Sequence, residues 1–166
     1  MKKKILITGA GSGIGKDTAF ALSKRGHFVI ATTETEDQAA GLKSTAQQLN
    51  LSMDVFKLDI TKAQDRELVK STPIDVLINN AGIGESGCIA EIDMEKVRNN
   101  FEVNVFSHFE LTQIVLKKMF EKNEGTVIFI SSLAGRIPRT FLGPYSMTKF
   151  ALSSGVETMR KEIHRV

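Results

Sequence analysis

The sequence predicts an α/β protein built on one doubly wound parallel sheet with helices on both of its faces. Short apolar segments alternate with longer segments of helical periodicity along the 166 residues, and a glycine-rich turn follows the first apolar segment. Strands that alternate with helices of about 10–15 residues form parallel βαβ units with right-handed crossovers. No repeat or low-complexity tract interrupts this order, so we expect a single domain covering residues 1–166.

Five segments have the short, apolar, β-branched composition of strands buried in a parallel sheet. The first of them ends in glycine, and the fourth is followed by the turn Asn79-Asn80-Ala81-Gly82. The expected strands are residues 4–8, 28–32, 53–58, 74–78 and 126–130.

The segments between these strands have helical patterns, and the ends of several are marked by typical boundary residues. Gly26 stops the first helix, Asn50 lies near the end of the second, and Pro73 follows the third. Pro144 opens the last helix, where its missing N–H costs little. The segment 93–121 is long enough for two helices or one bent helix. The expected helices are residues 14–24, 37–49, 62–70, 93–121 and 144–164.

Composition argues against several classes of protein. The net charge is +3 and the only tight basic cluster is Lys2-Lys3-Lys4, whereas a nucleic-acid surface needs a basic face with a recognisable motif. The apolar run Ile5-Leu6-Ile7 is too short for a secretory signal, and no stretch approaches the roughly 18 apolar residues of a membrane span. Cys88 is the only cysteine, so no internal disulfide forms, and a cytoplasmic location is the default expectation. We therefore expect neither a nucleic-acid nor a membrane partner.

The run Gly9-Ala10-Gly11-Ser12-Gly13-Ile14-Gly15 joins the first expected strand to the first helix. Glycines there permit a tight turn and close approach of the backbone to a pyrophosphate, and the helix N-terminus offers N–H groups to the phosphates. The spacing differs from the usual Gly-x-Gly-x-x-Gly, so a plain strand-to-helix turn stays an alternative. A P-loop is disfavoured because Asp17, after Lys16, occupies the Ser/Thr position.

Tyr145 and Lys149 have i,i+4 spacing, which places the phenol and the ammonium on one face of a helix. A cation beside a phenol favours the phenolate, so this tyrosine becomes a usable proton donor or acceptor. Ser132 follows the fifth expected strand. Alone, such a serine is usually a turn or cap residue, and a lone tyrosine usually packs. The three together indicate an enzyme that moves a proton together with a hydride.

These motifs occur in a familiar order: Thr8-Gly9-x-x-x-Gly13-Ile14-Gly15, Asn79-Asn80-Ala81-Gly82, Asn104, Ser132 and Tyr145-x-x-x-Lys149. In this respect the chain resembles a short-chain dehydrogenase/reductase along its whole length. The resemblance implies a Rossmann-type, three-layer α/β/α fold and an NAD(P)(H)-dependent oxidoreductase that interconverts a carbonyl and a secondary alcohol.

The resemblance also assigns catalytic roles. It makes Tyr145 the general acid/base and Ser132 the hydrogen-bond partner of the substrate oxygen. Lys149 would favour the phenolate of Tyr145 and bind the nicotinamide ribose. Asn104 would hold a water in a proton relay to Lys149, although a satisfied buried amide is the alternative reading of this residue.

The expected cofactor is NADP(H), with NAD(H) left open. Thr33 stands where NAD-binding proteins normally carry an acidic residue, and Lys16 is able to pair with a 2′-phosphate. Glu34 opposes this choice, because a shift of one residue would let it bind the NAD ribose. Asp59 resembles the family residue near the adenine amine, although a helix cap before Thr61 is an alternative.

No metal site is expected. The expected cofactor-binding residues are Gly9, Gly11, Ser12, Gly13, Ile14, Gly15, Lys16, Thr33, Glu34, Asp59, Ile60, Asn80, Ala81, Gly82, Tyr145 and Lys149.

The sequence departs from the family pattern at its C-terminal end. It stops at Val166, whereas family members usually continue with further strands and a substrate-covering segment. We therefore expect the C-terminal strands to be missing and the domain to be truncated, with an incomplete substrate pocket. A truncated, non-catalytic dinucleotide-binding module is the competing hypothesis, because it needs the glycine-rich turn but not Ser132, Tyr145 and Lys149. The expected partners are a small carbonyl or alcohol substrate and further copies of the chain, as a dimer or tetramer.

Overall fold

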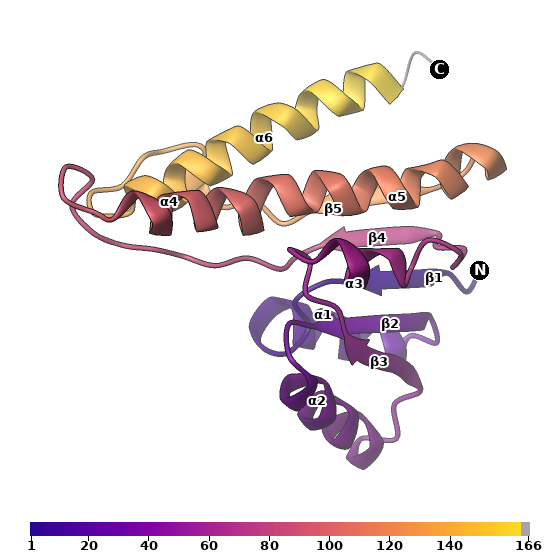
Figure 1. Ribbon diagram of the computed structural model, residues 1–166. Coiled ribbons are helices and arrows are strands. Elements are labelled where there is room, and N and C mark those ends of the chain that lie inside the picture. The colour runs from indigo at the N-terminus through magenta and orange to yellow at the C-terminus, as the bar shows by residue number, and fades with distance from the viewer. Residues whose placement is uncertain (164–166) are drawn as a thin grey trace. The chain divides into compact units, whose positions relative to one another are not determined.

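The computed structural model of the chain describes residues 1–163 (Figure 1). His164, the last residue of the final helix expected from the sequence, lies outside the described residues. The described residues fall into two compact units. The first unit contains Met1–Ala81 and Phe109–Ile128, and the second contains Gly82–His108 and the described residues from Phe129 onward. Among the described helices, none combines the length and apolar composition needed to cross a bilayer.

A parallel sheet of five strands has the order β3-β2-β1-β4-β5 (Figure 1). Strand β1 pairs in parallel with both β2 and β4, and β2 pairs in parallel with β3. The chain moves outward from β1 on one side and then adds β4 and β5 on the other, which confirms the predicted doubly wound sheet. The strand order reverses between β1 and β4, where such sheets bind ligands. The strands are β1 Lys4–Ile7, β2 Phe28–Thr33, β3 Met53–Lys57, β4 Val76–Asn79 and β5 Thr126–Phe129.

Both faces of the sheet are covered at its central strands β1, β2 and β4. Successive residues of a strand point to opposite faces, and Ile5, Leu6 and Ile7 of β1 are all buried. Val29 of β2 and Leu77 of β4 are completely buried as well. Each such side chain contributes about 1.5–3 kcal/mol relative to full exposure. These strands are continuous apolar runs because their side chains are buried on both faces of the sheet.

The helices follow the alternation that the sequence predicts. They are α1 Gly13–Lys24, α2 Glu36–Gln48, α3 Ala63–Glu67, α4 Met94–Phe101, α5 Ser107–Lys122 and α6 Gly143–Ile163, with a π-helical turn η1 Glu102–Phe106 and a 3₁₀ turn η2 Leu133–Gly135. Gly26, with φ +82°, and Asn50, with φ 53°, follow α1 and α2 in left-handed conformations. These are the residue types that reverse a chain after a helix at low cost.

The segment 93–121, expected as two helices or one bent helix, is two helices, α4 and α5, joined without a break by the π-helical turn η1. Another helical segment differs from its expected form. The helix expected at residues 62–70 is only Ala63–Glu67. The amides of Val69, Lys70 and Thr72 donate to carbonyls three residues earlier, so tighter turns replace the end of the expected helix.

Candidate active site

The glycine-rich turn of the first unit has two positions, Gly9 and Gly15, where close contacts leave no room for a side chain. Gly9 and Gly13 adopt left-handed φ values of 64° and 52°. A β-carbon at Gly9 would lie 2.6 Å from Ala81 Cα, and one at Gly15 would lie 2.5 Å from Gly9 O and would also overlap Asn80 Nδ2. The backbone of the turn therefore lies directly against the segment that follows β4.

The N-terminus of α1 is open to an anion. Ser12 is its N-cap residue, but the Ser12 side chain makes no capping hydrogen bond. The first N–H groups of a helix have no partner within the helix, and they attract negative charge together with the helix dipole. Gly11 and Ile14 belong to the same turn, and Ile14 is largely exposed. The turn has the close backbone approach and the donor groups that a pyrophosphate requires.

Thr8 and Asn80 connect the ends of β1 and β4. Thr8 Oγ1 accepts hydrogen bonds from the N–H groups of Asn80 and Ala81 at 3.0 and 3.1 Å. In return, Asn80 Nδ2 donates to Thr8 O at 2.9 Å and to Gly9 O at 3.1 Å. Asn80 thus stabilises the glycine-rich turn itself. Thr8 is not among the residues predicted for the site, although its place before Gly9 is the signal that marks it.

Asn79 has a different neighbour. Its Nδ2 donates to Thr112 Oγ1 at 2.8 Å, and both residues are buried, so β4 is tied to α5. Nothing in the sequence pairs Asn79 with Thr112, because the two belong to elements far apart in the chain.

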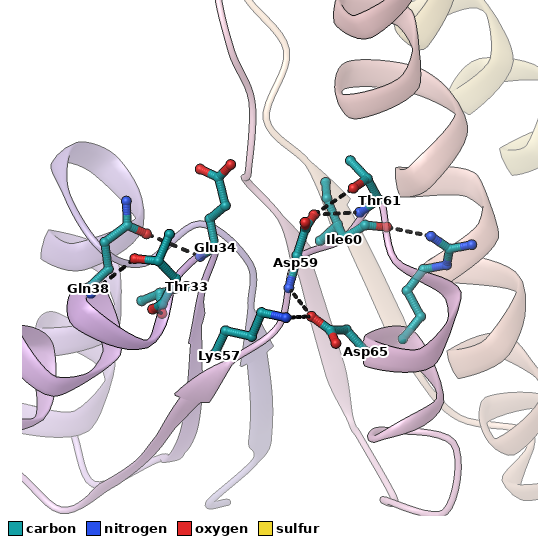
Figure 2. A network of polar contacts seen from close by, with 10 residues as sticks. Thr33, Glu34, Gln38, Lys57, Asp59, Ile60, Thr61 and Asp65 are labelled. Atoms are coloured by element: carbon teal, nitrogen blue, oxygen red, sulfur yellow. Dashed lines mark hydrogen bonds and ion pairs between the residues drawn. The ribbon is translucent and has the colours of Figure 1, made fainter.

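At the end of β2 the acidic side chain of Glu34 is exposed and the side chain of Thr33 is buried. Thr33 is completely buried, and its Oγ1 donates to Thr35 O at 2.9 Å. Glu34 is exposed, and its N–H donates to Gln38 Oε1 at 3.1 Å (Figure 2). The Gln38 side chain in turn lies near Gly11, where a β-carbon would be 3.3 Å from Gln38 Oε1. Lys16 Nζ lies 5.7 Å from the centre of the Phe20 ring.

Asp59 closes a tight turn after β3. Its Oδ1 accepts from the Thr61 N–H at 2.9 Å and from Thr61 Oγ1 at 2.8 Å (Figure 2). The N-cap of α3 is Lys62, so Asp59 stabilises a turn before the helix and does not cap the helix. Ile60, next in the chain, is buried.

The second unit contains Tyr145 and Lys149, both on α6. Lys149 Nζ lies 5.7 Å from the centre of the Tyr145 ring and donates to Ile130 O at 2.9 Å. Lys149 is almost fully buried, whereas Tyr145 is half-buried. Burial lowers the pKa of the Lys149 ammonium below its usual value, because a charged amine loses hydration there. The unit therefore combines a half-buried phenol with a fixed ammonium close to its ring.

Asn104 lies in the π-helical turn η1, and its side chain is fully used by neighbouring groups. Its Oδ1 accepts from the Ile83 N–H at 2.9 Å, and its Nδ2 donates to Ile83 O at 2.8 Å and to Thr148 Oγ1 at 3.1 Å. Thr148 Oγ1 donates to Tyr145 O at 2.7 Å. This chain of bonds positions the first turns of α6. Both donors of the Asn104 side-chain amide are engaged. A water relay through Asn104 stays a prediction.

Ser132 is the N-cap of η2, where its Oγ accepts from the Ala134 N–H at 3.1 Å. A serine hydroxyl that accepts one bond still has its own proton to donate. Gly135, at the end of η2, lies so close to α6 that a β-carbon there would be 2.7 Å from Lys149 O. The turn that Ser132 caps is therefore packed against the helix that carries Lys149. Gly82 begins the same unit.

Comparison with known proteins identifies the family. The short chain dehydrogenase family model matches residues 3–166. The chain belongs to the short-chain dehydrogenase family. An uncharacterized oxidoreductase of Bacillus subtilis is 36% identical over 98% of the chain and 61% of its own length.

Two solved structures in the family resemble the chain over almost its whole length. An actinorhodin polyketide ketoreductase variant with NADPH has a TM-score of 0.93 at 28% identity, over 99% of this chain and 66% of that one. A 7α-hydroxysteroid dehydrogenase with NADH and 7-oxo glycochenodeoxycholic acid has a TM-score of 0.89 at 30% identity, over 98% of this chain and 66% of that one. The chain thus spans about two thirds or less of the length of these relatives.

Proposed function

We propose that the protein containing this chain is an NAD(P)(H)-dependent oxidoreductase that interconverts a carbonyl and a secondary alcohol. The observation that carries the proposal is the half-buried phenol of Tyr145 beside the buried ammonium of Lys149. The relatives support it, because one solved structure is a ketoreductase with NADPH and another is a hydroxysteroid dehydrogenase with NADH.

The glycine-rich turn fits a dinucleotide. At Gly9 and Gly15 the backbone packs against Ala81 and Asn80 with no room for a β-carbon, and the N-terminus of α1 has N–H groups that the Ser12 side chain leaves uncapped. A bound nicotinamide would supply or accept the hydride. In this proposal Asp59 and Ile60 face the adenine, where the Asp59 carboxylate accepts from the adenine amine.

The second unit would handle the proton. As a carbonyl is reduced, negative charge grows on its oxygen, and hydrogen-bond donors aimed at that oxygen stabilise the transition state. Ser132 donates its hydroxyl proton to the oxygen as a hydrogen bond, and Tyr145 transfers its own proton to it. Lys149 stabilises the phenolate that remains and donates to the ribose of the cofactor. In alcohol oxidation the same groups act in the reverse direction.

Replacement of Tyr145 by phenylalanine tests the assignment. Because only the ionisable hydroxyl is lost, we expect kcat to fall by about 10²–10⁴-fold, while the Kd for NADPH and NADH changes little. Turnover is measured as cofactor oxidation with a panel of ketones and aldehydes. Ser132→Ala should lower kcat as well, whereas Ser131→Ala removes the adjacent exposed hydroxyl, which pairs with Ser153, and serves as the control.

Full activity in Tyr145→Phe would contradict the mechanism. Cofactor binding without turnover in the unaltered chain would favour the alternative of a non-catalytic dinucleotide-binding module for this part of the protein.

NADP(H) is the cofactor that we propose over NAD(H). The uncharged Thr33 side chain is buried and bonded to Thr35 O, so it neither binds two ribose hydroxyls nor repels a 2′-phosphate. The exposed Glu34 is the group that would oppose a phosphate. Glu34→Gln should therefore lower the Kd for NADPH and leave the Kd for NADH unchanged. A loss of NADH affinity in this variant, with no gain for NADPH, would instead identify Glu34 as the ribose ligand of an NAD enzyme.

We also propose that the whole protein forms a dimer or tetramer through α4, η1, α5 and α6. Met94, Phe106 and Phe150 leave large apolar side chains exposed on α4, η1 and α6. Light scattering of the protein at micromolar concentration measures the assembly, and a monomer would contradict this part of the proposal.

A further inference from the structure

The turn after β3 is held in place by two adjacent side chains of α3. Asp65 Oδ2 accepts from the Asp59 N–H at 2.7 Å (Figure 2). Arg66 Nη1 donates to Ile60 O at 2.6 Å. Asp65 thus binds the backbone donor of Asp59, and Arg66 binds the backbone acceptor of Ile60. The proposed function places both Asp59 and Ile60 at the adenine. Two such bonds from neighbouring residues fix the orientation of this short stretch of backbone.

Each of the two side chains has a further charged partner. Asp65 Oδ2 pairs with Lys57 Nζ of β3 at 2.6 Å (Figure 2), and Arg66 Nη2 pairs with Glu110 of α5. Burial disfavours the Asp65 carboxylate, but the bonds from Lys57 and the Asp59 N–H outweigh it and hold the pKa of Asp65 below its usual value. The turn is therefore connected through α3 to both a strand and a helix of the same unit.

Arg66 is more deeply buried than expected of an arginine whose only role is to pack a short helix. Its side chain is 9% exposed, whereas that of its partner Glu110 is 50% exposed. A buried guanidinium is costly unless its donors are satisfied, and a leucine or methionine would pack α3 at lower cost. What the arginine adds is the bond to Ile60 O, which an apolar residue cannot make.

We infer that Asp65 and Arg66 are positioning residues for the adenine end of the cofactor, which they would never touch. They hold the Asp59–Ile60 backbone so that the Asp59 carboxylate, with Oδ1 occupied by Thr61, faces the base in one orientation. This inference rests on the proposed cofactor site. It assigns affinity for the adenosine half to α3 and leaves the chemistry at Tyr145 untouched.

The test is titration calorimetry with ADP-ribose, which contains the adenosine half and no nicotinamide. Asp65→Ala and Arg66→Met should each raise the Kd for ADP-ribose by about tenfold, the effect of losing one charge-assisted hydrogen bond. Asp65→Asn keeps an acceptor for the Asp59 N–H and should restore most of the affinity. In an active holoenzyme the same variants should raise the KM for the cofactor and leave kcat at saturation unchanged.

Matched controls remove the same groups elsewhere. Glu67→Ala deletes an exposed carboxylate at the end of α3 that pairs with the nearby Lys70. Arg98→Met deletes an exposed arginine of α4 that pairs with Glu95. Both should leave the Kd for ADP-ribose unchanged. Thermal unfolding shows which variants are folded. If Arg66→Met does not fold, the Kd for ADP-ribose of Asp65→Ala is compared with that of Asp65→Asn, and this comparison tests the inference.

The outcomes separate this inference from the proposed function. If the unaltered chain fails to bind ADP-ribose, the proposed cofactor site is wrong and the inference falls with it. If the unaltered chain binds and the folded Asp65→Ala binds equally well, the inference alone is wrong. A fall in kcat at saturating cofactor would also overturn it, because positioning of the adenine leaves the proton transfer unaffected.

Discussion

The first unit shapes its site with backbone, and the second unit shapes its site with buried side chains. In the first, Gly9 and Gly15 press against Ala81 and Asn80, so no β-carbon fits. In the second, Asn104 and Lys149 are buried and donate hydrogen bonds to the backbone carbonyls of Ile83 and Ile130. The turn at Gly9 and Gly15 is therefore sensitive to an added atom, whereas the surroundings of Asn104 and Lys149 are sensitive to the loss of a polar group.

The largest effect is expected from adding one methyl group in the first unit. In Gly15→Ala the new carbon would overlap Gly9 O and Asn80 Nδ2, which would displace the N–H groups at the start of α1. We expect the Kd for ADP-ribose to rise by about 100-fold or more, equivalent to about 2.7 kcal/mol. Calorimetry gives the affinity, and urea unfolding should show a lower midpoint.

Gly41→Ala is the matched control, because Gly41 lies in α2 with no atom near the position of a new β-carbon. Alanine there should stabilise the helix by up to about 1 kcal/mol. Equal losses of binding in the two variants would mean that close packing is not what makes the turn sensitive.

Removal of a polar group from the second unit should have the next largest effect. Asn104→Ala would leave the N–H and C=O of Ile83 without their partner. We expect the free energy of unfolding to fall by about 2 kcal/mol, since an unsatisfied buried group costs about 1–3 kcal/mol. Asn99→Ala, at an exposed position of α4, should change it by less than about 0.5 kcal/mol. Similar losses in both would break the contrast between the units.

A smaller effect that depends on pH is expected at the opposite end of the sheet. A hydrogen bond from the Lys4 N–H holds the pKa of Asp75 below its usual value of 3.8. A carboxyl group with a lowered folded-state pKa contributes stability that is present above its unfolded pKa and lost as pH falls through the folded pKa. The stability gap between the chain and Asp75→Asn should be constant above about pH 5 and should shrink below about pH 4.

Unfolding of both proteins by urea across the acid range measures this gap. Asp54→Asn, on the exposed edge of β3, matches the change in charge. A gap that widened on acidification would mean that the sign assigned to Asp75 is wrong.

The smallest effect is expected from an exposed ion pair of α6. Glu157 pairs with Arg160 at 2.7 Å and with Lys161 at 3.8 Å, and all three side chains are more than half exposed. Such pairs gain little in water and cost side-chain entropy. Glu157→Gln should therefore leave the urea midpoint unchanged within error at moderate salt. A clear loss would show that side-chain contacts in this unit matter even at its surface.

Local patterns in the sequence determined most of the secondary structure. The β-branched runs predicted five strands, and Gly26 and Asn50 marked helix ends, because strand periodicity and left-handed residues depend on near neighbours. The i,i+4 spacing of Tyr145 and Lys149 likewise followed from helix geometry. The ends of the short helix α3 were missed, because hydrogen bonds at Val69, Lys70 and Thr72 tighten its last turns.

By itself the sequence determined the fold class, the glycine-rich turn and the spacing of the candidate catalytic side chains. Only the tertiary structure decided which partners the polar groups have. Asn80 bonds to Thr8 across 72 positions, and Asn104 bonds to Thr148 across 44. In the sequence, nothing distinguishes Arg66 from an ordinary surface residue. It is buried because α3 packs beside α5, where Arg66 pairs with Glu110. A buried polar group must find a partner, but the packing of distant elements chooses that partner, and no local pattern encodes the choice.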